Sequence, residues 1–164
     1  MKSTGKAKRK TRVEIRYSSQ PAQEDEKWLL KEEAHLFPAY RNLKVWGKAH
    51  DNLLDIINLL KAIPDNSVTG RIKDQIIGAA SSVGANIAEG SGIYRGKRFV
   101  GHLEIAVDSA CETDNWLQVL KDSRIGNVDF DKALLESIIQ RNCEVIKMLL
   151  GLIQSIEKKR ASAL

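Results

Sequence analysis

The feature that most constrains the fold is the spacing of the apolar residues, which recur every three or four positions over four long segments. A period near 3.6 residues is typical of an amphipathic α-helix that packs in a bundle. Between residues 43 and 63 the predicted stripe consists of Leu43, Trp46, His50, Leu53, Ile57 and Leu60, and it is widened by Ala49, Ile56 and Ile63. Residues 64–67, Pro-Asp-Asn-Ser, favour a turn and end this segment.

Three further segments show the same period. The second is predicted from about Thr69 to Glu89, with the glycines of residues 90–92 as its end, because glycine suits the residue after a helix. The third starts near residues 95–97, and the fourth follows Asp129, its predicted N-cap, and reaches Arg160. The third stripe consists of Phe99, Leu103, Ala106, Ala110, Thr113, Leu117 and Leu120.

Four such segments joined by short turns predict an all-α protein, an up-down-up-down antiparallel four-helix bundle. Three prolines and 5% aromatic residues in 164 positions argue against a sandwich or barrel of strands. The length fits one domain. We expect a basic, partly disordered extension at 1–38, in which 22–36 favour a short helix, then the bundle at 39–160 and a tail at 161–164.

The N-terminus carries the excess positive charge of the chain, whose net charge is +5. Seven of the first 16 residues are basic, and Glu14 is the one acid among them. Such a run cannot bury enough surface to order itself, and it attracts polyanions. A contact with nucleic acid and a merely solvated tail or cloning remnant both remain open, whereas a membrane surface is less favoured.

The predicted topology also gathers charge at one end of the bundle, where the first and third helices start and the second and fourth end. We call this end the basic pole. The cations expected there are Arg41, Lys44, Lys48, Arg95, Lys97, Arg98, Lys158, Lys159 and Arg160. The middle of the bundle carries acids instead, namely Asp51, Asp55, Glu104, Asp108, Glu112, Asp114, Glu136 and Glu144.

Groups that could perform catalysis are few. Glu32 and His35 form a single E-x-x-H, whereas di-iron bundles need a pair of these motifs. His102 and Glu104 form an H-x-E without the P-C-x-x-C that zinc deaminases also require. His50 lies in an apolar stripe and is interpreted as a core residue rather than a base. We therefore expect no enzyme activity, no metal site and no cofactor.

The chain shows no apolar stretch near the length of a membrane span and no apolar block of a secretory signal at its start. Cys111 and Cys143 belong to no C-x-x-C pair, which fits a reducing compartment. These observations predict a cytoplasmic protein.

The stretch 82–92 is rich in small residues around two polar ones. Asn86 and Glu89 lie three positions apart and share a helix face, and Ser109 and Glu112 have the same spacing on the next helix. Buried amides and carboxylates need hydrogen-bond partners. We interpret the four residues as a polar clasp between helices, with direct contact to a ligand as the alternative.

Three motifs of the chain make it similar to a known family. They are L-K-V-W-x-x-A-H at 43–50, D-Q-I-I-x-A-A-x-S-V-x-A-N-I-A-E-G-x-G at 74–92, and F-V-x-x-L-E-I-A-x-x-S-x-x-E at 99–112. Together they resemble the bacterial four-helix-bundle proteins encoded in intervening sequences of large-subunit ribosomal RNA genes. The resemblance covers about residues 40 to 157.

That family is related to the accessory variability proteins of diversity-generating retroelements, which form pentameric rings and bind a reverse transcriptase and nucleic acid. The resemblance therefore implies a non-catalytic, pentameric bundle with basic surfaces for RNA or DNA. The family usually has proline where Gly84 stands, and often a basic pair where Ile77 and Gly78 stand. The second difference removes a basic patch from this helix.

We therefore expect a homo-oligomeric accessory protein that binds nucleic acid, with a reverse transcriptase as a candidate partner. The alternatives are a protein-interaction scaffold and a ribosomal RNA intervening-sequence protein of another role. Trp46 and Trp116 are expected to be core or interface anchors, and Tyr94 is the better candidate for stacking on a base. The residues expected to contact phosphates are Lys6, Lys8, Arg9, Lys10, Arg12, Arg41, Lys44, Arg95, Lys97, Arg98, Lys158, Lys159 and Arg160.

Overall fold

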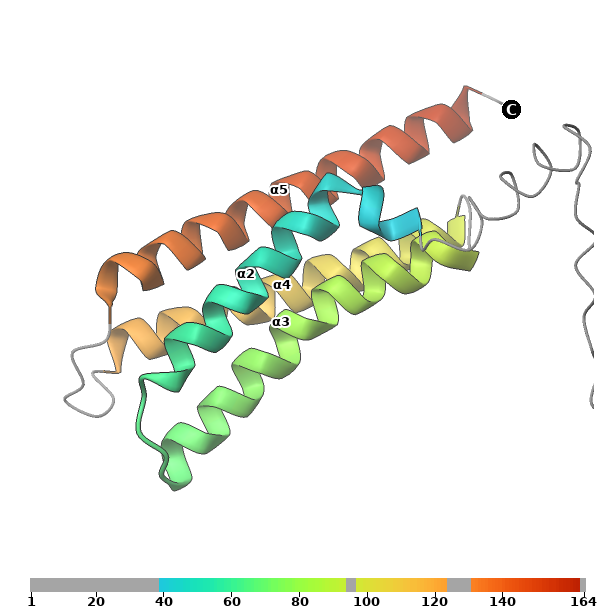
Figure 1. The fold of residues 1–164 in the computed structure, drawn as a ribbon. Helices are drawn as coiled ribbons and strands as arrows, with labels where there is room; N and C mark the ends of the chain where they lie inside the picture. Colours follow the sequence, from blue (N-terminus) through green and yellow to red (C-terminus); the bar gives the residue numbers. More distant parts are fainter. Residues whose placement is uncertain (1–38, 94–96, 124–130, 163–164) are drawn as a thin grey trace, which may run out of the picture. The chain divides into compact units, whose positions relative to one another are not determined.

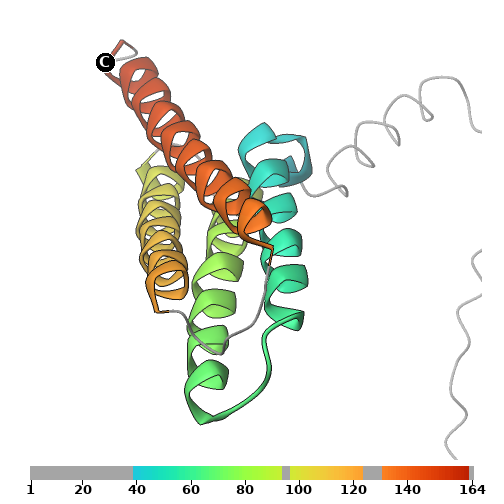
Figure 2. The ribbon, with the colours of Figure 1, turned by 90° about the vertical axis from the view of Figure 1, so that its left-hand side faces the viewer.

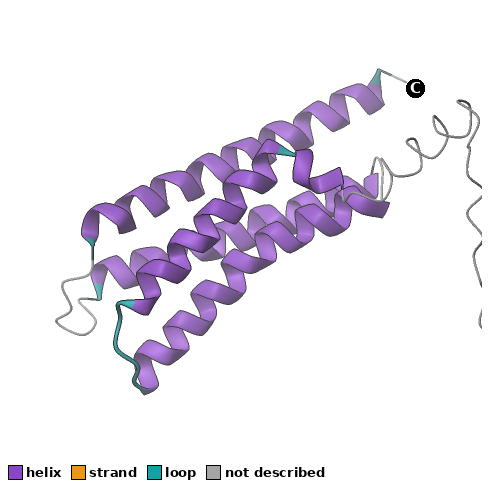
Figure 3. Ribbon diagram, in the orientation of Figure 1, coloured by secondary structure: helices purple, strands orange, loops and turns teal. Residues whose placement is uncertain are grey.

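The structure, a computed structural model, describes residues 39–93, 97–123 and 131–162. A 3-10 helix, η1 (Ala39–Asn42), precedes four α-helices: α2 (Lys44–Lys61), α3 (Ser67–Ile93), α4 (Lys97–Asp122) and α5 (Lys132–Ala161) (Figure 1). Within these ranges there is no strand (Figure 3). The predicted extension at 1–38, Tyr94, Arg95 and Asp129 lie outside the described residues.

The four α-helices form a closed bundle. Each helix packs against the next one along the chain, and α2 also packs against α5. Neighbouring helices run in opposite directions, as the two views of Figures 1 and 2 show. The predicted all-α, up-down-up-down bundle is therefore confirmed.

The interior of the bundle consists of two apolar clusters, one toward each end. The cluster at the basic pole includes Val45, Ile87, Leu103 and Leu149. The cluster at the opposite end includes Ile56, Ile76, Leu117 and Ile138. Each of the four helices contributes to both clusters, so the two ends of the bundle are held by separate sets of side chains.

Polar side chains separate the two clusters. Asn52, Thr113 and Asn142 occupy the core positions between them on α2, α4 and α5, and each is at most 3% exposed. We call these three residues the polar layer. The Asn142 amide donates to the Ala110 carbonyl oxygen at 2.8 Å, and the Thr113 hydroxyl donates to the Ser109 carbonyl oxygen at 2.8 Å. Oδ1 of Asn52 is buried without a hydrogen-bond partner among the described residues.

The predicted face of the first long helix overlaps the observed one in part. Of the predicted positions, Ala49, Ile56 and Leu60 are buried in α2, and Val45, Asn52 and Leu59, which lie outside the stripe, are buried as well. Trp46 and Leu53 are partly buried and pack against the two apolar clusters, and with His50 they border α3. His50 is exposed, so its interpretation as a core residue is wrong.

The predicted end of the second helix at residues 90–92 is also wrong, because α3 continues to Ile93. Gly90 is buried, and a Cβ atom on it would lie 2.6 Å from the Cβ atom of His102 and 2.9 Å from Cδ2 of Phe99. This glycine therefore serves the close approach of α3 and α4 rather than a turn.

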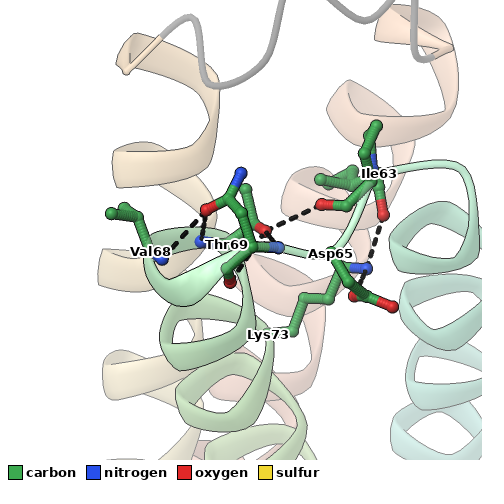
Figure 4. Close-up of polar contacts among 7 residues, drawn as sticks. Ile63, Asp65, Val68, Thr69 and Lys73 are labelled. Carbon is green, nitrogen blue, oxygen red and sulfur yellow. Dashed lines mark hydrogen bonds and ion pairs between the residues drawn. The ribbon is translucent and has the colours of Figure 1, made fainter.

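Side chains cap two of the helices. Asn66 Oδ1 accepts the N–H groups of Val68 and Thr69, each at 2.9 Å, and the Thr69 hydroxyl accepts the Asn66 N–H at 2.8 Å (Figure 4). This reciprocal pair resembles a capping box and starts α3 at Ser67. Asp131, not the predicted Asp129, caps α5, and its carboxylate accepts the Leu134 N–H at 2.9 Å.

Lys73 stabilises the turn between α2 and α3. The Lys73 ammonium donates to the Ile63 carbonyl oxygen and pairs with Asp65 at 2.6 Å (Figure 4). Because the last carbonyls of a helix lack partners within the helix, a cation at that point stabilises its end. This lysine therefore closes the end of the bundle opposite the basic pole.

Candidate nucleic-acid interface

The basic pole brings together the ends of four helices. The start of α2, the end of α3, the start of α4 and the end of α5 lie toward the same end of the bundle (Figure 1). The predicted phosphate-contacting residues that the structure describes there are all exposed: Arg41, Lys44, Lys97, Arg98, Lys158, Lys159 and Arg160. Lys6, Lys8, Arg9, Lys10, Arg12 and Arg95 lie outside the described part of the chain.

Two groups of these cations differ in what they do for the helices. Lys158, Lys159 and Arg160 occupy the last turn of α5, where positive charge stabilises the negative end of the helix dipole. Lys44 begins α2, and Lys97 and Arg98 begin α4, and neither first turn contains an acid. Cations at a helix N-terminus oppose the dipole. Helix stability therefore explains the cations at the end of α5 and does not explain those at the starts of α2 and α4.

Lys48 belongs to a different arrangement, on the face shared by α2 and α5. Its ammonium pairs with Glu144 of α5, and a second ion pair joins Arg141, one turn away on α5, to Asp55, about two turns further along α2. The hydrogen bond and the charge of Lys48 lower the pKa of Glu144 below its usual range. An open groove of about 580 Å³ follows these pairs and is also lined by Lys44 and Leu54. The charge of Lys48 is therefore offset by Glu144, whereas Lys44 forms no ion pair with another described residue.

A second hollow lies between α2 and α3, close to the basic pole. It measures about 230 Å³, and Tyr40, Trp46 and His50 form one of its sides. The Trp46 and His50 rings stack with centroids 4.9 Å apart and planes 14° apart, and the Tyr40 ring lies 4.7 Å from Trp46. We call this hollow the aromatic pocket. Trp46, which is expected to be a core or interface anchor, packs against the apolar cluster at the basic pole, and its spacing of four from His50 places the two rings on one helix face.

The predicted polar clasp is assembled differently from the expectation. Asn86 donates to the Ser82 carbonyl oxygen at 2.9 Å and to the Ser82 hydroxyl at 3.1 Å, and the Ser82 and Ser109 hydroxyls lie 2.9 Å apart. Ser82, which was not among the four residues expected in the clasp, thus joins α3 to α4. Glu89 and Glu112 are exposed and take no part in these hydrogen bonds.

The described residues form neither a metal site nor a membrane-spanning helix. No group of three or more His, Cys, Asp or Glu side chains in ranges 39–93, 97–123 and 131–162 is placed to hold a metal ion. None of the helices in these ranges has the length and apolar character to cross a membrane. Cys111 is exposed and Cys143 is partly buried, and both are free thiols.

Comparisons with known proteins cover the same part of the chain as the bundle. Residues 41–151 match the sequence profile of the family described as 23S rRNA-intervening sequence protein. The chain is also similar to the crystal structure of a protein with unknown function from the S23 ribosomal protein family of Bacteroides thetaiotaomicron. The two chains share 28% identity with a TM-score of 0.58, over 66% of this chain and 97% of that one. No curated protein matches the chain.

Proposed function

Because the chain belongs to the 23S rRNA-intervening sequence protein family, we propose that it is a non-catalytic accessory protein that binds the backbone of RNA or DNA through its basic pole. The observation that carries this proposal is the position of Lys44, Lys97 and Arg98 in the first turns of α2 and α4. Residues that break a local rule of helix stability are expected where function requires them.

Phosphate contacts explain how such a surface acts. Lys and Arg side chains that neutralise phosphates release counterions, so the affinity falls steeply as the salt concentration rises. These contacts carry little information about base sequence. The proposed protein therefore holds many nucleic acids in a similar way, and its selectivity comes from the shape of the nucleic acid or from a partner.

We further propose that the protein acts as a homo-oligomer, with five copies as the family resemblance implies. Three large apolar side chains support an assembly, since Leu54, Ile105 and Leu150 are 46%, 49% and 45% exposed. Several basic poles in one assembly would bind one nucleic acid together and raise the overall affinity. Light scattering on a gel-filtration peak tests this point, and a mass near the 18.3 kDa of one chain would refute it.

The test of nucleic-acid binding compares two triple variants with the same change in charge. Lys44→Gln, Lys97→Gln and Arg98→Gln together remove three cations of the basic pole, whereas Lys61→Gln, Arg71→Gln and Lys132→Gln remove three exposed cations of the opposite end. Fluorescence anisotropy with a labelled oligonucleotide gives the affinity over a range of salt concentrations. The first variant is expected to lower the slope of log affinity against log salt by about two to three, because each phosphate contact contributes about 0.9. Equal slopes for the two variants would refute the basic pole as the interface.

A protein-interaction scaffold is the second candidate function, and the surface of α4 supports it. Glu104, Asp108 and Glu112 are spaced by four, are exposed, and form no ion pair with another described residue. Like charges at this spacing destabilise a helix slightly. A basic partner, such as a reverse transcriptase, would offset that repulsion. In that case Glu104→Gln with Asp108→Asn would abolish capture of the partner and leave nucleic-acid affinity intact.

A further inference from the structure

We propose that the aromatic pocket receives one unstacked base of a single-stranded nucleic acid, with a neighbouring phosphate on Arg41. The inference rests on the proposed function and adds to it a preference for single strands over duplexes. The basic pole by itself would hold single strands and duplexes alike, whereas a pocket for one base favours the single strand.

The first step is the shape of the aromatic wall. The nearly parallel Trp46 and His50 rings follow each other along α2, and Tyr40 continues the wall from η1. Trp46 is partly buried against the apolar cluster at the basic pole, and its stacking on His50 covers one face of each ring. His50 is exposed, so its other face is the one offered to a base, and exposed aromatic faces beside positive charge are the surfaces on which bases stack.

The second step is the opposite wall, which α3 forms from short side chains. Ser81, Gly84 and Ala85 line it, and a Cβ atom on Gly84 would lie 3.7 Å from Nε1 of Trp46. The absence of longer side chains leaves the volume of about 230 Å³. Pockets for drug-sized ligands begin at roughly 300 Å³. The aromatic pocket therefore suits one flat ring system and not a larger molecule.

The third step is the charge at the rim. The exposed Arg41 guanidinium lies over the Tyr40 ring at 5.9 Å from its centroid. A cation over an aromatic face is held by the ring. The pocket thus combines an apolar, ring-lined interior with a cation beside one of its walls, which is the chemistry of a nucleotide: an aromatic base joined to an anionic phosphate.

The choice of a single strand over a duplex follows from the cost of exposing a base. A duplex keeps its bases stacked, and extruding one requires that it be unpaired and unstacked, whereas a single strand offers its bases freely. An apolar protein segment would also fit the walls, but its binding would gain nothing from Arg41 and would depend little on salt.

The experiment fills the pocket without changing its charge. Ala85→Leu places a large side chain in the pocket from an exposed helix position, and Ala133→Leu makes the same change at an exposed position of α5 as the control. Ser81→Leu fills the pocket from the preceding turn and provides a second variant. Oligo(U), oligo(dT) and a duplex of equal charge serve as probes. Circular dichroism confirms that each variant is helical.

We expect Ala85→Leu and Ser81→Leu to weaken binding of both single strands about tenfold, which corresponds to the loss of one stacked base. Duplex affinity and the Ala133→Leu variant should be unchanged. With Trp28 and Trp116 replaced by Phe, the remaining Trp46 fluorescence should be quenched by the single strands and not by the duplex. Equal affinities of Ala85→Leu and Ala133→Leu for single strands, or quenching by the duplex as well, would overturn the inference.

A failure of the proposed function would give a different result. If neither the single strands nor the duplex bound the unaltered protein, the basic pole would not be a nucleic-acid interface at all. If both bound with equal affinity and the filled pocket had no effect, the function would stand and only the base pocket would be refuted. Salt-independent binding of an apolar peptide that Ala85→Leu abolishes would assign the pocket to a protein partner and overturn the inference.

Discussion

Gly90 of α3 and His102 of α4 approach so closely that a Cβ atom on the glycine would lie 2.6 Å from the Cβ atom of the histidine. Neither atom can move without moving a helix backbone, because both would be the first atoms of their side chains. The contact therefore fixes the distance between α3 and α4 next to the basic pole.

Gly90→Ala is expected to lower the free energy of unfolding by about 1–3 kcal/mol, the usual cost of overfilling a packed site. Gly78→Ala is the control, because nothing lies within 4 Å of a Cβ atom there, and alanine in an open helix position stabilises by about 0.5–1 kcal/mol. Urea unfolding monitored by circular dichroism measures both. Stabilisation by both substitutions would mean that the helices move apart freely at Gly90.

In the polar layer, by contrast, one substitution is expected to raise the free energy of unfolding. Asn52→Leu removes a buried oxygen without a hydrogen-bond partner, so it should raise the free energy of unfolding by about 1–2 kcal/mol. Asn142→Leu makes the same chemical change where the amide is bonded to Ala110, so this variant should be less stable than Asn52→Leu by roughly 1 kcal/mol. Equal unfolding free energies would contradict the difference between the two amides.

The pair of Lys48 and Glu144 predicts a dependence of stability on pH. Since the folded protein lowers the pKa of Glu144 from its ordinary 4.5, the pair stabilises the fold above that value and the contribution is lost as the pH falls through the lowered pKa. Glu144→Gln should therefore be less stable than the unaltered protein at pH 7, and the two should converge on acidification.

Unfolding in urea from pH 7 down to pH 3 measures this convergence. Glu112→Gln, at an exposed carboxylate without an ion pair among the described residues, is the matched control and should follow the unaltered protein throughout. High salt should shrink the effect of Glu144→Gln, because both partners are partly exposed. A difference that persists at pH 3 would show that the pair is not its cause.

The hydroxyl pair of Ser82 and Ser109 can be tested by a double-mutant cycle. Ser82→Ala, Ser109→Ala and the double variant should give a coupling energy of about 0.5–1.5 kcal/mol, as for one hydrogen bond between helices. Glu89→Gln and Glu112→Gln should change the free energy of unfolding by less than about 0.5 kcal/mol, because both residues are exposed. A larger change in the free energy of unfolding at either glutamate would indicate that the glutamate does belong to the clasp.

The sequence predicted the helices better than their ends. The stripe from Leu103 to Leu120 identified buried residues of α4 because a core stripe and a helical period coincide there. Gly90 was misread because glycine both ends helices and permits close packing, and only the residues facing it on α4 distinguish the two uses. Asp131 was missed because two aspartates near the turn could each have capped the helix.

The candidate site was predictable where topology alone decides it. The alternation of four helices places Lys44, Lys97 and Lys158 at one end whatever their side chains contact. The aromatic pocket could not be predicted in this way, because it depends on the short side chains that α3 places opposite Trp46 and His50. Trp46 packs against the apolar cluster at the basic pole, as a core anchor does, whereas His50 is exposed.

The polar layer also determines how the bundle can move. If α4 and α5 slid past each other by one turn, the Asn142 amide would lose the Ala110 carbonyl oxygen and would lie among aliphatic side chains, where an unpaired amide is costly. Sliding is therefore costly, whereas a small tilt about the layer keeps each polar group at the same height. A nucleic acid that spread the helices at the basic pole would accordingly pivot them and draw the opposite ends together.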